Sequence, residues 1–169
     1  MEESRTIKII KWIVLGLAIA VNVFIIVNAC IPGPQSSEES KWIVEPVANA
    51  INAIKEDTIN SSNYDNFSSF MRKFVGHFSL FGLSGVLTTF SFKFFYYDKY
   101  QKYPLFIVFS SISGLFLAIL TELIQSFVPG RSGEIIDVLI DLSGYLIGVI
   151  IAGVVTYILK IKTNQVEKV

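Results

Sequence analysis

The chain has 169 residues, of which 52% are hydrophobic and only 17% charged, and its formal net charge is zero. This composition is unlike that of an ordinary soluble domain or a disordered chain, and it indicates a membrane protein. The sequence contains no basic stripe of the kind that binds nucleic acid, so we expect no nucleic-acid partner.

The first apolar stretch covers residues 7–29, which is long enough to cross a hydrocarbon core that needs about 20 helical residues. Its charged start and the sequence Val27-Asn28-Ala29-Cys30 also resemble a signal peptide with a lipoprotein cleavage site. The long apolar core and Asn28 favour a retained anchor, but the residues leave open whether Cys30 is lipidated. Cys30 is the only cysteine, so no intramolecular disulfide can form, and we expect a packed thiol near the outer interface.

Residues 30–72 form a polar segment with more acids than bases, and we expect this segment to be extracellular. Apolar residues recur at helical spacing between positions 43 and 54, which predicts an interfacial helix. Pro46 disfavours the helical conformation of Glu45. We therefore expect the helix to be split, with its longer piece beginning near the proline.

Three more apolar stretches can span a membrane, over residues 74–95, 104–128 and 135–159. A turn rich in tyrosine and lysine follows the first of these, and Pro129-Gly130 separates the other two. The prediction is a single all-α domain over residues 1–169, an integral membrane bundle of four transmembrane helices.

Lysines and arginines accumulate on the cytoplasmic side of membrane proteins, and here three groups of them agree on one orientation. They place both termini inside, and the residues are Arg5, Lys8, Lys11, Lys93, Lys99, Lys102, Lys160, Lys162 and Lys168. The chain is therefore expected to cross a membrane several times, with both termini in the cytoplasm.

Polar side chains in the second, third and fourth spans fall at one depth when the spans are given this orientation. A charged side chain at the centre of a membrane helix costs roughly 2.5–3.5 kcal/mol on insertion scales and commonly marks a functional site. We expect a functional polar cluster in the outer leaflet, facing the extracellular side. Its members are His77, Glu122, Gln125, Arg131, Ser132, Asp137 and Asp141.

Asp137, Asp141, Gly144 and Gly148 share one face of the fourth span, since residues three, four or seven apart lie on the same side of a helix. The two glycines form a pattern of small residues that allows close packing of membrane helices. We assign Gly144 and Gly148 a role in helix packing.

Arg131 has two interpretations that can hold together. In the structural one, it pairs with Glu122 or Asp137 and ties the loop to the bundle. In the functional one, Arg131 and His77 attract an anionic group at the membrane surface.

The polar set resembles that of the VanZ-like family of bacterial membrane proteins, which is linked to teicoplanin resistance. The resemblance rests on four motifs, namely residues 72–77 (RKFVGH), Glu122 with Gln125, residues 129–132 (PGRS), and Asp137 followed by Gly144 and Gly148. Members of the family usually have an asparagine where this chain has Asp141.

The resemblance implies a multi-pass protein of the bacterial cytoplasmic membrane that acts in the cell envelope and lowers susceptibility to lipoglycopeptides such as teicoplanin. The ligand it suggests is a membrane lipid or a lipid-linked cell-wall precursor, or the lipoglycopeptide itself. The alternative is an intramembrane enzyme that acts on a lipid-linked substrate through His77, Glu122, Asp137, Asp141 and Arg131. One histidine and scattered carboxylates have no recognised ligand spacing, so we expect no metal and no cofactor. The residues do not predict an oligomeric state.

Overall fold

The structure is a computed structural model that describes residues 5–97 and 105–166, with side chains up to residue 159. The regular elements in these residues are all helical. They are α1 (Arg5–Ala29), α2 (Gly33–Ile54), α3 (Tyr64–Met71), the π-helix η1 (Arg72–Phe78), α4 (Ser79–Phe92), the π-helix η2 (Lys93–Tyr97), α6 (Leu105–Gln125) and α7 (Ile135–Val166). The expected turn at Lys99 and Lys102, and Lys168, lie outside the described residues, as do the side chains of Lys160 and Lys162.

Four helical stretches are long and apolar enough to cross a membrane, which confirms the predicted all-α fold and its four spans. They cover Arg5–Ala29, Tyr64–Tyr96, Leu105–Gln125 and Ile135–Leu159. The second begins ten residues earlier than predicted, because α3, η1 and α4 follow one another without a break. The third ends at Gln125, since the next residues form turns in which the Val128 N–H donates to the Gln125 carbonyl. The orientation of the bundle in the membrane stays a prediction.

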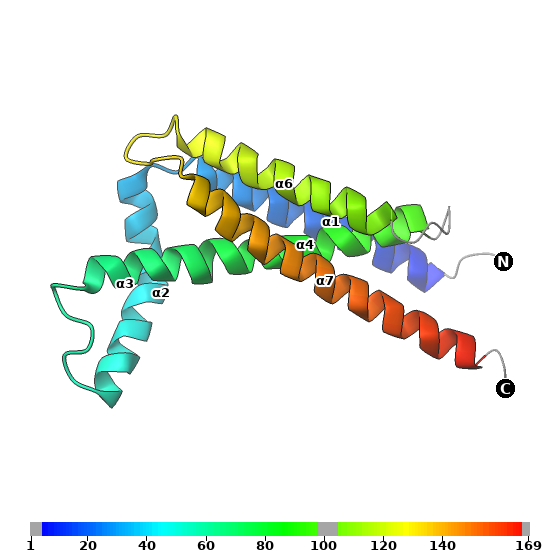
Figure 1. Cartoon of the computed structure of the whole chain (residues 1–169), viewed down its shortest axis with the longest axis horizontal. Helices are drawn as coiled ribbons and strands as arrows, with labels where there is room; N and C mark the ends of the chain where they lie inside the picture. Colours follow the sequence, from blue (N-terminus) through cyan, green and yellow to red (C-terminus); the bar gives the residue numbers. More distant parts are fainter. Residues whose placement is uncertain (1–4, 98–104, 167–169) are drawn as a thin grey trace.

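The four spans form a bundle, and α2 lies across one end of it (Figure 1). The loop between α6 and α7 is at the same end as α2, whereas the start of α1 and the end of α7 lie at the other (Figure 1). Both ends of the described chain are therefore on the same side of the bundle.

The second span approaches α7 closely at small residues, through the end of η1 and the start of α4. A Cβ atom on Gly144 would overlap the carbonyl oxygen of Phe78, and one on Gly148 would overlap that of Gly82. Only a residue without a side chain lets the two backbones come this near, so Gly144 and Gly148 lie directly in the contact.

Polar side chains join α1 to α4 within the bundle. Asn22 accepts a hydrogen bond from the Ser84 hydroxyl at 2.5 Å, and its amide nitrogen donates to the Thr88 hydroxyl at 3.4 Å. Hydrogen bonds of this kind stabilise helix pairs in a medium without water.

The expected break of the outer helix at Pro46 is wrong, because α2 runs without interruption from Gly33 to Ile54. Pro46 is exposed, while Val44 and Ala48 on the opposite side are buried and hold both halves of the helix in place. Proline removes one backbone hydrogen bond, and on an exposed face that loss does not end the helix.

The expected packing of Cys30 is also wrong, since its thiol is free and exposed. The residue follows the last turn of α1, where the chain bends toward α2 and leaves the side chain outside the bundle.

Candidate functional site

A cavity of about 1200 Å³ opens at the end of the bundle that α2 crosses. One part of its wall is apolar and includes Phe24, Ile25, Val44, Leu80 and Phe81. The other part carries polar and charged groups from η1, the α6–α7 loop and the start of α7. The cavity therefore offers charge beside an apolar surface.

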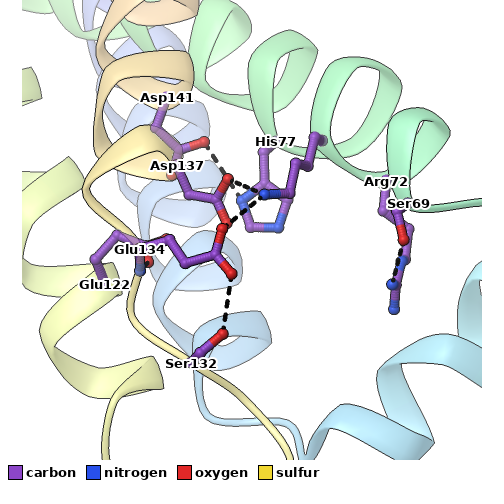
Figure 2. Close-up of polar contacts among 9 residues, drawn as sticks. Ser69, Arg72, His77, Glu122, Ser132, Glu134, Asp137 and Asp141 are labelled. Carbon is purple, nitrogen blue, oxygen red and sulfur yellow. Dashed lines mark hydrogen bonds and ion pairs between the residues drawn. The ribbon is translucent and has the colours of Figure 1, made fainter. Parts of the chain in front are cut away.

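The predicted cluster divides between the wall of this cavity and the protein behind it. The members that line the cavity are His77, Gln125, Arg131, Ser132 and Asp137. Glu122 and Asp141 are buried next to His77, with 5% and 0% of their surfaces exposed. Residues from three separate spans and one loop thus meet in a single region, as Figure 2 shows.

The π-helix η1 places three basic side chains of the second span at the cavity, namely those of Arg72, Lys73 and His77. A π-helix has i→i+5 hydrogen bonds, and such segments inside longer helices are rare and frequently occur at functional sites. Neither the hydropathy nor the composition of residues 72–78 predicts this change in helical pitch.

Lys73 pairs with acids at the start of α7. Its ammonium lies 2.6 Å from Asp137 Oδ1 and 3.1 Å from Glu134 Oε2. Ser132 donates to the other oxygen of Glu134 at 3.1 Å. The hydrogen bonds from Lys73 and Ser132 lower the pKa of Glu134, which is exposed outside the spans. This chain of contacts joins η1 to the loop before α7 (Figure 2).

His77 faces Asp141 across the contact between η1 and α7, with 3.3 Å between His77 Nδ1 and Asp141 Oδ1 (Figure 2). Glu122 approaches the same point from α6. One ligand atom from each of these three residues lies within 4.8 Å of the others. This set of donors could hold a metal ion, a possibility that their spacing in the sequence does not indicate.

Glu122 is fixed by the backbone that precedes α7. Its Oε2 atom accepts a hydrogen bond from the Glu134 N–H at 3.0 Å, whereas its Oε1 atom is buried without a hydrogen-bond partner. A carboxylate at the start of a helix is also favoured by the helix dipole.

The expected pairing of Arg131 with Glu122 or Asp137 is wrong. Arg131 Nε donates to the Ile31 carbonyl at 3.1 Å and Nη2 to the Asn28 carbonyl at 3.4 Å. The last carbonyls of a helix have no partner within it, and the guanidinium adds a donor at the end of α1 and at the turn that follows it. Arg131 thereby ties the α6–α7 loop to α1 rather than to the acids of the bundle.

Arg72 is a second arginine of the cavity, and sequence reasoning did not select it. It donates to the hydroxyls of Ser37 at 2.7 Å and Ser69 at 3.4 Å. Burial lowers the pKa of Arg131, and the charge of Arg72 nearby lowers it further. Within the described residues, neither arginine has a carboxylate at ion-pair distance.

A signal for Arg72 was present in the sequence. The predicted topology put the start of the second span and the loop of Arg131 at the same end of the bundle, and an arginine there could have been grouped with Arg131. The sequence does not show where α2 lies, and therefore does not show that Ser37 of α2 accepts a hydrogen bond from the Arg72 guanidinium.

Comparison with known proteins identifies one family. The family model described as VanZ/LLP1 matches residues 13–156 of the chain. No curated protein and no solved structure matches the chain.

Proposed function

Because the chain belongs to the VanZ/LLP1 family of membrane proteins, we propose that it works in a bacterial cell envelope by binding the anionic headgroup of a lipid-linked molecule. The ligand class is a lipid phosphate such as a cell-wall precursor or the carrier of another envelope polymer. This binding lowers susceptibility to teicoplanin-type lipoglycopeptides, because it changes the lipid-linked anions that the drug meets at the outer surface.

The observation that carries the proposal is a pair of arginines without carboxylate partners in one cavity. Arg72 donates to side-chain hydroxyls and Arg131 donates to backbone carbonyls. Both kinds of partner are uncharged, so they do not neutralise the positive charge of either guanidinium. Guanidinium groups bind phosphate through paired, charge-assisted hydrogen bonds. A phosphate between them would offset the repulsion that the two cations exert on each other.

The apolar part of the cavity suits the rest of such a ligand. Phe24, Val27 and Leu83 are exposed apolar residues that line it. Ligand sites commonly combine an apolar wall with a few charged groups that fix orientation. A headgroup at the arginines and a hydrocarbon chain along this wall would fill both parts.

The test is binding of a polyprenyl phosphate to the purified protein in nanodiscs, with the uncharged polyprenol of equal length as the control ligand. We expect saturable binding of the phosphate only. Arg72→Gln should weaken it about 10- to 100-fold, the loss expected for one charge-assisted hydrogen bond. Lys41→Gln is the matched control variant, since Lys41 is an exposed cation of α2 that pairs with Glu38 instead.

Equal binding of phosphate and polyprenol, or no effect of Arg72→Gln, would contradict the proposal. The cellular part is tested with the same variants, by measuring teicoplanin susceptibility and membrane abundance in one set of cultures. Arg72→Gln should be present at the wild-type level and protect less, whereas Lys41→Gln should protect fully.

An enzyme acting on the same class of lipid is the second candidate. The observation that favours it is the group of His77, Glu122 and Asp141, which brings the imidazole that lines the cavity together with two carboxylates buried behind it. Release of inorganic phosphate from the polyprenyl phosphate by purified protein would support the enzyme. Saturable binding without release would support the binding protein.

A further inference from the structure

Behind the wall of the cavity, potential metal ligands from η1, α6 and α7 converge on one point. We infer that His77, Glu122 and Asp141 bind a divalent transition-metal ion. This site is separate from the pair of arginines, and the inference does not rest on the proposed binding of a lipid anion.

The distances suit coordination. His77 Nδ1 and Asp141 Oδ1 are 3.3 Å apart, which is about the separation of two ligands on a tetrahedral ion with bonds of about 2.1 Å. One ligand atom from each of the three residues lies within 4.8 Å of the others, so the side chains would draw together around an ion to bring all three to bonding distance. Each ligand comes from a different helical element, and the site is therefore held by the packing of the bundle.

The two carboxylates each have an oxygen without a hydrogen bond. Asp141 is fully buried, and its Oδ2 atom has no hydrogen-bond partner. The residue Glu122 is 5% exposed, and its Oε1 atom is buried and has no hydrogen-bond partner either. A buried charge without a partner is strongly unfavourable. These two oxygens belong to residues whose ligand atoms converge, so a cation among them would satisfy both.

Lys73 of η1 does not supply that charge. Lys73 contacts Glu134 and Asp137, at distances of 3.1 Å and 2.6 Å, and these acids are on the cavity side. The remaining oxygen of Glu122 accepts from the Glu134 N–H, which orients the carboxylate. Contacts of this type around a ligand are usual in metal sites and fix the direction of the free oxygen.

The ligand types select the class of metal. An imidazole with two carboxylates suits Zn²⁺ or a neighbouring transition metal better than Mg²⁺ or Ca²⁺, which prefer oxygen alone. Three protein ligands leave at least one position of a zinc ion open.

The test uses the full chain, purified in detergent, stripped with a chelator and titrated with Zn²⁺ or Co²⁺. We expect one Zn²⁺ per chain by elemental analysis, and visible absorption bands from tetrahedral Co²⁺. Asp141→Asn should weaken binding by at least about tenfold, since loss even of a residue that orients a ligand has an effect of about this size. Asp137→Asn is the matched control, because Asp137 lies one turn away and contacts Lys73 instead.

Absence of stoichiometric metal in the wild type, or equal binding by Asp141→Asn and Asp137→Asn, would overturn the inference. If Asp141→Asn does not accumulate, Glu122→Gln replaces it, since the glutamine oxygen can still accept from the Glu134 N–H. The measurement contains no lipid, so a failure here is distinct from a failure to bind polyprenyl phosphate.

Discussion

Glu122 has one oxygen in a hydrogen bond and one without, and two substitutions separate these features. Glu122→Gln keeps an acceptor for the Glu134 N–H, whereas Glu122→Ala leaves this partly buried donor without one. An unsatisfied buried donor costs about 1–3 kcal/mol, so we expect the alanine variant to be less stable than the glutamine variant by about that amount. Thermal unfolding of the purified proteins in chelator, without metal, measures the difference.

Equal unfolding temperatures for the two variants would show that the hydrogen bond to Glu134 does not hold the α6–α7 loop. If the two variants are equal to each other but both less stable than the wild type, the negative charge that both have lost supports the fold, and the partner of that charge must be sought among His77 and the start of α7.

The residues of the cluster could be predicted, but several of their partners could not. The order of the spans was enough to bring Glu122, Asp137 and Asp141 to the same end of the bundle as Arg131. The contact of Arg131 with the Asn28 and Ile31 carbonyls depends on where α1 ends beside the loop, and no pattern in the sequence specifies this. Carbonyl groups belong to every residue type, so a partner of this kind has no signature.

The contact between η1 and α7 leaves no space for a side chain at Gly144. We expect Gly144→Ala to destabilise the protein by about 1–3 kcal/mol, because an added Cβ would press on the Phe78 backbone and overpacking has costs of this size. Gly16→Ala is the matched control, since a Cβ on Gly16 would meet nothing within 4 Å. Thermal unfolding in detergent, with both variants beside the wild type, gives the comparison.

A Gly144→Ala protein as stable as the Gly16→Ala protein would mean that α7 can move away from η1 and α4 without loss. In that case His77 and Asp141, which sit on either side of this contact, should also separate, and the alanine variant should bind Zn²⁺ more weakly. Undiminished stability and undiminished metal binding together would contradict the close approach of the two backbones.

The membrane helices follow from hydropathy because their apolar runs are continuous, but the segments at the outer end do not. Residues 64–73 are too polar to be assigned to a span from composition. They nevertheless form α3 and the start of η1, which lead into α4 as one helical stretch. Pro46 gave a local reason to break α2, and the burial of Val44 and Ala48 outweighs it. In both places tertiary packing decides the outcome, and such packing is not visible along the chain.

Both ends of the described chain lie on one side of the bundle, opposite α2 (Figure 1). We predict that this side is cytoplasmic and that Cys30, the only cysteine, faces outward. A membrane-impermeant maleimide should then label Cys30 in intact cells. Mass analysis of the purified chain measures the fraction modified.

Two variants in a Cys30→Ser background complete this test. Lys8→Cys, in the first turns of α1, should react only after the cells are permeabilised, and Lys41→Cys, on α2, should react in intact cells. The opposite pattern would invert the topology and place the cavity on the cytoplasmic side. Labelling of Lys41→Cys without labelling of Cys30 would keep the topology and show that the native thiol is blocked, as by a lipid.

The contacts that close the outer end of the bundle also set an order of events during synthesis. Arg131, about a hundred residues later in the chain, donates to the Asn28 and Ile31 carbonyls, and the Gly33 N–H donates to the Pro129 carbonyl. Until the ribosome has made that loop, the corner between α1 and α2 lacks these partners. We therefore expect the cavity to be absent when α1 and α2 have just been made. It can form only after synthesis has passed the third span and reached the loop that carries Arg131.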